Sequence, residues 1–319
     1  MGEFIGGSYP LAAQRRAGHR FRRLALMTEI FRTPDERFEN LPGYDYEPNY
    51  VEVNGMRLHH LDEGEGQPVL CFHGEPSWSY LYRKMLDLLV ADGKRVICPD
   101  LVGFGRSDKP TDQQWYTYER HCDSVNAHLD QIDGLEDVTV VVQDWGGAIG
   151  LRWAIEHADQ VGRLLIMNTG IFTGRVSKGF MAWREFAEKT TDLPVGMIIE
   201  NSTTSELSPE VIAAYEAPFP NVESKAGAHQ FPLLVPINND EDGVTEMMAV
   251  HDALADWDKP TLVAFADHDP IFPYPKSGDR FTELIPTAGE QVRIENAGHF
   301  LQEDKPEEIV AAMRAELFS

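Results

Sequence analysis

The ten residues from Val138 to Gly147 constrain the fold of this chain more than any other stretch does. They read Val-Thr-Val-Val-Val-Gln-Asp-Trp-Gly-Gly, an apolar run that ends in a carboxylate and two glycines. Such a run is typical of a buried parallel strand, and the glycines let a following helix pass close to that strand. We therefore predict a sharp strand-to-helix turn that exposes the Asp144 side chain at its apex, beside the first N–H groups of the helix.

An aspartate at this apex restricts the chemistry that the turn can perform. Many hydrolases carry serine there, but a serine that attacked an alkyl carbon would form an ether, which water does not readily cleave. An aspartate forms an ester instead, and an activated water can hydrolyse it. Asp144 therefore indicates attack on a saturated carbon, although a plain turn or helix start also explains an Asp-x-Gly-Gly stretch taken alone.

Strand and helix patterns alternate along most of the chain. Runs typical of strands occupy 50–53, 57–61, 69–72, 95–99, 138–143, 164–168, 261–266 and 292–295. Helical patterns occupy 78–90, 118–132, 146–157 and 306–317. Repeated strand–helix–strand units require parallel strands with helices on both faces. The sequence therefore predicts an α/β fold with a mostly parallel, doubly wound sheet.

Between Asn168 and Lys259 the strand rhythm breaks, and helical and aromatic patterns replace it. A structureless loop of that length would be unusual, so we predict an inserted helical cap. The expected division is an N-terminal extension (1–32), a first part of the core (33–170), the cap (171–250) and a second part of the core (251–319). Residues 1–26 are rich in arginine and lack an apolar signal region. A tag, an over-extended start or a loose tail explains them, with Met27 as the true start; an amphipathic arm or a targeting segment stays open.

The charge balance narrows the classes of partner. The 319 residues include 28 basic and 52 acidic side chains, which give a net charge of -24. This excess of negative charge argues against nucleic acid and anionic membrane surfaces as binding partners, and it favours neutral substrates. No apolar stretch approaches the roughly 20 residues that span a bilayer. We expect a protein without a membrane partner, whose excess acid serves solubility.

The three cysteines, Cys71, Cys98 and Cys122, lie far apart and show no metal-ligand spacing. Neither a zinc site nor a disulfide framework is indicated. An odd number of thiols in mostly apolar surroundings fits a reducing compartment, so we expect a cytoplasmic protein.

The predicted base and acid also follow strands. His299 lies in Glu-Asn-Ala-Gly-His-Phe, where a glycine turns the chain after the last strand. Asp269 follows the strand before it, in Ala-Asp-His-Asp-Pro-Ile-Phe-Pro, with Asp267 as a competitor. The order Asp144, acid, His299 matches the nucleophile–acid–base order of α/β-hydrolases. We prefer Asp269 because its Asp-x-Ile-x-Pro context resembles the acid loop of this fold.

The stretch His-Gly-Glu-Pro that begins at His73 follows a strand and precedes a helix. From this position the backbone N–H of Glu75 can join that of Trp145 in an oxyanion hole. A tight turn that caps a helix would need the same backbone, so the sequence leaves both interpretations open.

Four segments together resemble the haloalkane dehalogenases, from about Thr33 to the C-terminus: His73-Gly74-Glu75-Pro76, residues 100–110 (Asp-Leu-Val-Gly-Phe-Gly-Arg-Ser-Asp-Lys-Pro), Gln143-Asp144-Trp145-Gly146-Gly147 and Ala297-Gly298-His299-Phe300. The resemblance implies that Trp145 and a cap tryptophan, Trp183, hold the departing halide through their N–H groups. Glu75 is similar to the glutamate of the branch that uses a cap tryptophan and places its acid after the later strand, which supports Asp269.

The mechanism that follows begins with displacement of halide by Asp144 at a saturated carbon, leaving an alkyl ester. A water activated by His299 and Asp269 then hydrolyses the ester. The expected partners are a small neutral halogenated alkane and water, with no cofactor and no metal, and we expect a monomer. Under the cap we predict an apolar pocket. Its expected aromatic lining is Phe180, Phe186, Phe219 and Phe231.

Three alternatives remain at the sequence level. An epoxide hydrolase would need a cap acid, commonly paired tyrosines, and only Tyr215 lies in a suitable segment. Fluoroacetate-type dehalogenation would need arginines to bind a carboxylate, which the acidic composition discourages. An inactive binding protein with the same fold is the alternative of another class, because a fold does not by itself determine a function.

Overall fold

The central element is an eight-stranded sheet with the order β10-β9-β8-β7-β4-β5-β3-β2. The computed structural model describes residues 28–172, 174 and 176–319, so the expectations for residues 1–26 and Met27 lie outside the described residues. The strands are β2 (Asn49–Val53), β3 (Met56–Glu63), β4 (Gln67–Phe72), β5 (Lys94–Pro99), β7 (Val138–Gln143), β8 (Val161–Met167), β9 (Thr261–Ala266) and β10 (Val292–Ile294). Two short strands, β1 (Ile30–Phe31) and β6 (Lys109–Pro110), pair separately.

The sheet is parallel from β5 to β10 and antiparallel only at the β3 and β2 edge. Every residue of β7 and of β9 is buried, as expected for central strands with helices on both faces. The eight predicted strands are all present. The predicted α/β class with a mostly parallel sheet is confirmed.

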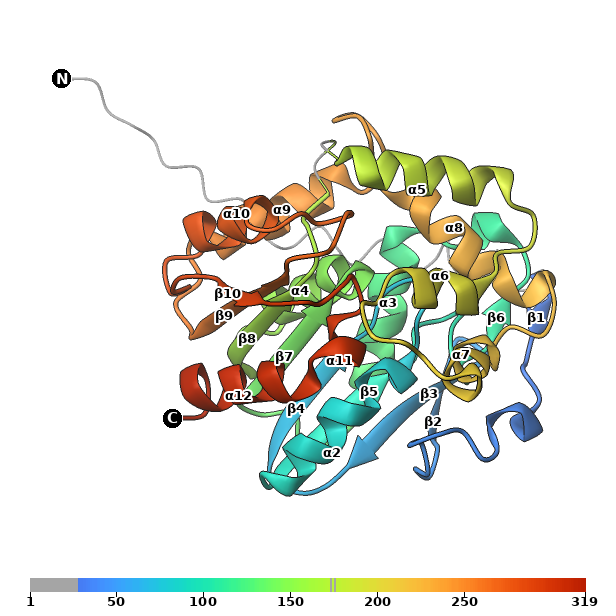
Figure 1. Ribbon diagram of the computed structural model, residues 1–319, viewed down its shortest axis with the longest axis horizontal. Helices are drawn as coiled ribbons and strands as arrows, with labels where there is room; N and C mark the ends of the chain where they lie inside the picture. Colours follow the sequence, from blue (N-terminus) through green and yellow to red (C-terminus); the bar gives the residue numbers. More distant parts are fainter. Residues whose placement is uncertain (1–27, 173, 175) are drawn as a thin grey trace.

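Helices cover both faces of the sheet (Figure 1). The core helices are α2 (Arg83–Ala91), α3 (Tyr118–Leu129), α4 (Trp145–Glu156), α9 (Val244–Leu254), α10 (Lys276–Leu284), α11 (Leu301–Asp304) and α12 (Pro306–Glu316). Helix α2 packs against α12 on one face, while α4 packs against α3 and α9 on the other. No helix in the described part of the chain is long and apolar enough to cross a membrane.

Four helices inserted after β8 form the layer in which we expected a cap. They are α5 (Lys178–Lys189), α6 (Val195–Asn201), α7 (Pro209–Glu216) and α8 (Ala226–Leu234), and they pack as the pairs α5·α8 and α6·α7. The next helix, α9, contacts α4 of the core. The expected cap boundary at residue 250 therefore falls inside a helix that packs on the core.

The turn between β7 and α4 has the geometry that the opening motif predicts. Asp144 has φ 52° and ψ −128°, a conformation that a residue with a side chain adopts at a cost. Gly146 and Gly147 lie so close to the backbone of Phe72 and the side chain of Thr169 that a Cβ on either would collide. The bare backbone thus lets α4 begin directly beside the sheet, with its first N–H groups next to the Asp144 carboxylate.

Candidate active site

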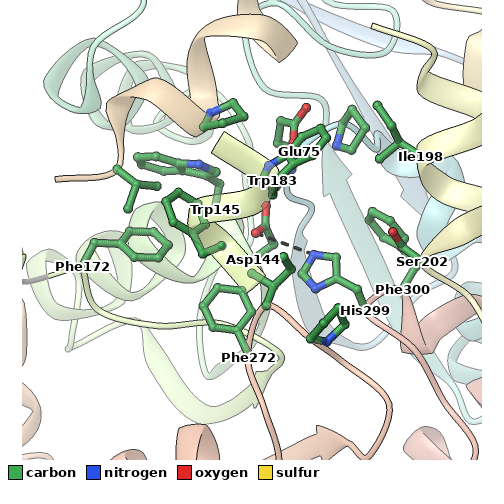
Figure 2. Close-up of a pocket in the computed structure, with 16 residues that line it drawn as sticks. Glu75, Asp144, Trp145, Phe172, Trp183, Ile198, Ser202, Phe272, His299 and Phe300 are labelled. Carbon is green, nitrogen blue, oxygen red and sulfur yellow. Dashed lines mark hydrogen bonds and ion pairs between the residues drawn. The ribbon is translucent and has the colours of Figure 1, made fainter. Parts of the chain in front are cut away.

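The two carboxylate oxygens of Asp144 have different surroundings (Figure 2). The Glu75 backbone N–H donates a hydrogen bond of 2.8 Å to Oδ1. The Trp145 backbone N–H also hydrogen-bonds to this carboxylate. Oδ2 lies 3.7 Å from His299 Nε2, across the cavity. The backbone groups expected to form an oxyanion hole therefore meet at the side chain expected to act as the nucleophile.

Asp269 is the acid that contacts His299. Its Oδ2 lies 2.8 Å from His299 Nδ1, and its Oδ1 accepts hydrogen bonds from the backbone N–H groups of Ile271 and Phe272 at 2.7 Å and 3.1 Å. The competitor Asp267 turns away and pairs with Arg293 at 2.9 Å. These bonds fix the orientation of the Asp269 carboxylate, which in turn orients the imidazole so that Nε2 points at Asp144.

His299 and Asp144 influence each other's ionisation in this cluster. Burial disfavours the charged imidazolium most strongly, yet Asp269 and Asp144 together raise the pKa of His299 above its ordinary value. Burial raises the pKa of Asp144, against the opposing effects of His299 and the backbone donors of Trp145 and Glu75. His299 thus holds a proton more readily while Asp144 carries a negative charge.

Two amides that sequence reasoning did not assign hold the histidine loop. Gln143 Nε2 lies 3.1 Å from His299 Nε2 and donates to the His299 carbonyl at 3.2 Å. Asn168 Nδ2 donates to the carbonyls of His299 and Gly298, both at 3.1 Å, while its Oδ1 accepts from the Ala266 N–H at 2.9 Å. Gln143 ends β7 and Asn168 follows β8, and this position at the end of a parallel strand is the signal that could have found them.

Asp144 and His299 line a cavity of about 90 Å³. Trp145 and Trp183 line it from α4 and from the cap helix α5. Neither indole N–H hydrogen-bonds to another described residue. The remaining lining is mostly apolar and comprises Glu75, Pro76, Phe172, Phe180, Ile198, Ser202, Pro232, Val235, Pro270, Ile271, Phe272, His299 and Phe300. Among the described residues no group of three or more His, Cys, Asp or Glu is arranged to hold a metal ion.

Phe180 lines this cavity, but the expectation for the other three phenylalanines needs correction. Phe186 is 40% exposed and stacks on the outer side of Trp183, because it lies about 240° around α5 from Phe180. Phe231 is buried behind Trp145, with ring centroids 4.8 Å apart. Phe219 packs against Phe104 in the interior, away from the cavity.

The Glu75 side chain is a further feature that the sequence did not reveal. Its carboxyl is 5% exposed and lines the same cavity, and its Oε1 has no hydrogen-bond partner among the described residues. Burial, and secondarily the charge of Asp144, raises the pKa of Glu75 well above its ordinary value. The charged form of this carboxyl is therefore disfavoured next to Asp144.

The fold and the site together define a class of protein. Asp144, Asp269 and His299 each follow a parallel strand, and they meet in the chain order expected of a nucleophile, an acid and a base. The chain matches the sequence model of the α/β-hydrolase fold over residues 67–204 and 248–306. It is an α/β-hydrolase with an aspartate where serine commonly stands.

Comparisons with known proteins identify the family within that class. The chain is 46% identical to a haloalkane dehalogenase of Psychrobacter cryohalolentis over 88% of its length and 95% of the relative. It is 44% identical to a haloalkane dehalogenase of Mycobacterium marinum over 88% of its length and 97% of that relative. The chain belongs to the haloalkane dehalogenase family. The solved tetrameric structure of the haloalkane dehalogenase DpaA from Paraglaciecola agarilytica NO2 superposes with a TM-score of 0.86 and 34% identity, over 91% of this chain and 100% of that one.

Proposed function

We propose that this chain hydrolyses halogenated alkanes to an alcohol, a halide ion and a proton through an ester on Asp144. The observation that supports this most directly is the difference between the two oxygens of that carboxylate. Glu75 N–H holds Oδ1, whereas Oδ2 faces the cavity and His299. One oxygen is thereby free to attack, while the other sits in the environment that a developing oxyanion needs.

In the first step Oδ2 of Asp144 attacks the saturated carbon of the substrate. The new C–O bond forms as the carbon–halogen bond breaks, and the halogen leaves with the electron pair as a halide ion. Trp145 and Trp183 present indole N–H groups at the cavity without competing protein acceptors. Such donors stabilise an anion where solvent is largely excluded, so we assign them to the departing halide.

In the second step His299 takes a proton from water, and the hydroxide attacks Cγ of the ester. The negative charge develops on Oδ1, where the N–H groups of Glu75 and Trp145 stabilise it. Collapse expels the alcohol oxygen, which receives the proton from His299, and the restored carboxyl of Asp144 loses its proton to solvent. Water thus supplies both the alcohol hydrogen and the released proton.

Ester formation itself prepares the base for this step. The charge of Asp144 is one of the contributions that raise the pKa of His299. The ester is neutral, so that contribution disappears when the alkyl group is attached. His299 should consequently be less basic in the intermediate than in the free enzyme, which favours the neutral imidazole that must accept a proton from water.

The size and lining of the cavity support short, uncharged substrates. A volume of about 90 Å³ accommodates a few carbon atoms and a halogen, and the lining from Phe172, Phe180 and Phe272 is apolar. The described lining contains no arginine to bind a carboxylate and no tyrosine to protonate an epoxide oxygen. Tyr215 is buried elsewhere, with its hydroxyl 2.7 Å from Glu303 Oε1. Epoxide hydrolysis and fluoroacetate-type dehalogenation are therefore less well supported.

The test is halide release from 1-bromobutane, followed by intact and peptide mass spectrometry, in His299→Ala and in the unmodified protein. We expect continuous turnover by the unmodified protein. The variant should release about one halide per active site and retain a butyl group on the peptide that contains Asp144. His268→Ala is the matched control, because His268 is exposed and pairs with Asp267 outside the site; it should turn over normally.

Two further variants examine the halide donors. Trp145→Phe and Trp183→Phe should each slow halide release by about 10²-fold or more, as loss of a charge-stabilising donor commonly does. Trp257→Phe removes a buried indole distant from the cavity lining and should leave the rate unchanged. Release of bromide by His299→Ala without any adduct on Asp144, or turnover of styrene oxide in place of bromobutane, would contradict the proposed function.

A monomeric state and a cytoplasmic location stay predictions. Cys71, Cys98 and Cys122 are buried free thiols, which supports a reducing compartment. The relative from Paraglaciecola agarilytica is tetrameric, so light scattering on a sizing column is needed to determine the assembly of this chain.

A further inference from the structure

A second cavity, of about 730 Å³, lies beside the active site. It is bordered by the segment after β8, the start of α5, the loop after β9, and the helices α9 and α10, which lie next to each other in Figure 1. Four residues line both cavities: Phe172, Phe180, Ile271 and Phe272. Together with Phe281 and Leu284 they give the second cavity a large apolar surface. Only a shared wall of side chains therefore separates it from the proposed reaction site.

The second cavity is also lined by positively charged side chains that form no ion pair with any described residue. Lys178, Lys276 and Arg280 line it, and all three are exposed. Every other lysine and arginine in the described part of the chain donates a hydrogen bond or forms an ion pair, whereas these three do neither with any described residue. In a protein with a net charge of -24, unpaired cations would be expected to find acidic neighbours easily. Their concentration at one cavity marks it as electrostatically distinct.

The positions of these cations within their helices increase the positive potential. Lys178 is the first residue of α5, whose first turn contains no acidic residue. Lys276 is the first residue of α10, and Arg280 follows one turn later. The N-terminus of a helix carries partial positive charge, so cations are unfavourable there. Glu283 is the one acidic residue in the described lining, and Asp279 of α10 accepts a hydrogen bond from Gln291 instead. An anion in the cavity would relieve this repulsion.

We propose that the second cavity binds an aliphatic carboxylate, with the carboxylate at Lys178, Lys276 and Arg280 and the chain against the apolar surface. The cationic edge selects a negative headgroup, and the phenylalanines select a hydrocarbon tail in preference to a small inorganic ion. Because Phe172 and Phe272 belong to both cavities, an occupant of the second cavity pushes on the wall of the first. Binding should therefore change the KM for a haloalkane without the carboxylate entering the reaction site.

The test is isothermal titration calorimetry with hexanoate, 1-hexanol and bromide as separate probes. Calorimetry reads binding directly, so its result is independent of whether the chain dehalogenates anything. We expect hexanoate to bind clearly more tightly than either 1-hexanol or bromide. The double variant Lys276→Gln/Arg280→Gln should weaken hexanoate binding by at least about tenfold, since it removes two charge-assisted contacts.

The matched control is Lys189→Gln/Arg314→Gln, which removes the same charge from surface positions that pair with Glu185 and Asp92. It should bind hexanoate like the unmodified protein. Lys178→Gln, on the other helix, provides a second probe of the same site and should weaken binding as well. A bound hexanoate should also shift the KM for 1-bromobutane in the unmodified protein and not in the double variant.

Three results would overturn the proposal. The first is that hexanoate produces no heat at any accessible concentration, and the second is that 1-hexanol or bromide binds as tightly as hexanoate does. Equal weakening in the double variant and in its control would show that only the overall charge matters. Each of these results leaves the proposed dehalogenation untouched, because that is tested by the adduct on Asp144.

Discussion

At the scale of single residues, Glu75 contributes to the site through both its backbone and its side chain. Its backbone N–H binds Oδ1 of Asp144, and its side chain buries a carboxyl in the same cavity without a partner for Oε1. A second ionised carboxylate there would oppose the negative charge that the proposed reaction needs on Asp144 and then transfers to the halide. A neutral carboxyl avoids this repulsion, so the protonation state of Glu75 is part of the electrostatic design of the cavity.

Replacing Glu75 by glutamine should change how the stability of the protein depends on pH. The ordinary pKa of a glutamate is 4.5, and burial holds the pKa of Glu75 well above it in the folded protein. Between these two values the unfolded chain binds fewer protons than the folded one, so stability of the unmodified protein falls as pH rises, by up to about 1.4 kcal/mol per pH unit. Glutamine has nearly the same shape as glutamate but does not ionise, so the variant should not lose stability in this way as the pH rises.

The melting temperature of Glu75→Gln relative to the unmodified protein should therefore increase between about pH 5 and about pH 8. Thermal unfolding by circular dichroism at both pH values measures this difference. Glu295→Gln, at an exposed position, is the control and should show no such trend. A difference that is constant with pH would mean that Glu75 ionises normally in the folded protein.

The sequence predicts the placement of residues that lie at strand ends, while the roles of these residues stay predictions. Asp144, Asp269 and His299 each follow an apolar run, and parallel strands deliver such residues to one edge of the sheet. Residues whose contacts depend on side-chain direction were harder to predict. Phe186 lies near Phe180 in sequence but about 240° from it around α5, and the orientation of the Glu75 carboxyl depends on packing between distant segments.

At the scale of elements, the β7–α4 turn depends on the absence of side chains on its inner face. The Cβ of an alanine at position 147 would overlap with the side chain of Thr169, whose hydroxyl donates to the Asp144 carbonyl at 2.6 Å. The Thr169 side chain cannot move away easily, because Thr169 is fully buried beside β8. The geometry of Asp144, the proposed nucleophile, is thus coupled to the packing of α4.

We predict that Gly147→Ala lowers the free energy of unfolding by about 1–3 kcal/mol, the usual cost of overpacking a filled interior. It should also reduce the rate of ester formation, because displacement of Thr169 shifts the Asp144 backbone. Urea denaturation and the halide burst measure the two effects. At Gly289 a new Cβ would meet no atom within 4 Å, so Gly289→Ala should change neither quantity. Equal stability of both variants would contradict the close approach at position 147.

The element boundaries show which signals the sequence carries. Strands such as β7 and β9 are buried throughout and were predicted with their observed limits, because continuous apolar runs leave little ambiguity. Helix α10 was not predicted. Only Gly278 and Phe281 of its residues are buried, and its nine-residue sequence is mostly polar, so few apolar side chains mark it as a core helix.

At the scale of the whole molecule, a buried cluster connects the cap to the core. Tyr215 of α7 donates a hydrogen bond of 2.7 Å to Glu303 of α11, and Arg83 of α2 pairs with the same carboxylate. The three side chains come from three helices that are distant in sequence. This contact holds the cap over the carboxyl ends of the strands, where the cavity lies between the two layers.

Removing one hydroxyl from this cluster should loosen the cap without disturbing the reacting groups. We expect Tyr215→Phe to lower the free energy of unfolding by about 1 kcal/mol, the typical contribution of one hydrogen bond. Amide hydrogen exchange should become faster in α6 and α7 while β7 keeps its protection. Tyr274→Phe is the control, because the Tyr274 hydroxyl makes no hydrogen bond with a described residue. Unchanged exchange in α7 would show that the hydrophobic contacts alone hold the cap.

The overall charge of the molecule could be read from the sequence, but its distribution could not. A net charge of -24 correctly describes the whole chain and says nothing of where unpaired cations gather. Lys178 and Lys276 are almost 100 residues apart, and only the packing of α5 near α10 brings them to one cavity. Long-range proximity of this kind depends on the tertiary fold.

The unequal oxygens of Asp144 have a consequence for the path of each oxygen atom through successive cycles. In the proposed mechanism the alcohol departs with the former Oδ2, and the water oxygen replaces it in the carboxylate. The hydrogen bond from the Glu75 N–H to Oδ1 opposes rotation of the Asp144 carboxylate, so the oxygen from water occupies the Oδ2 position. The oxygen atom of every alcohol molecule is then the one that the carboxylate took from water during the preceding turnover, so the isotopic composition of the product follows that of the solvent with a delay of one turnover.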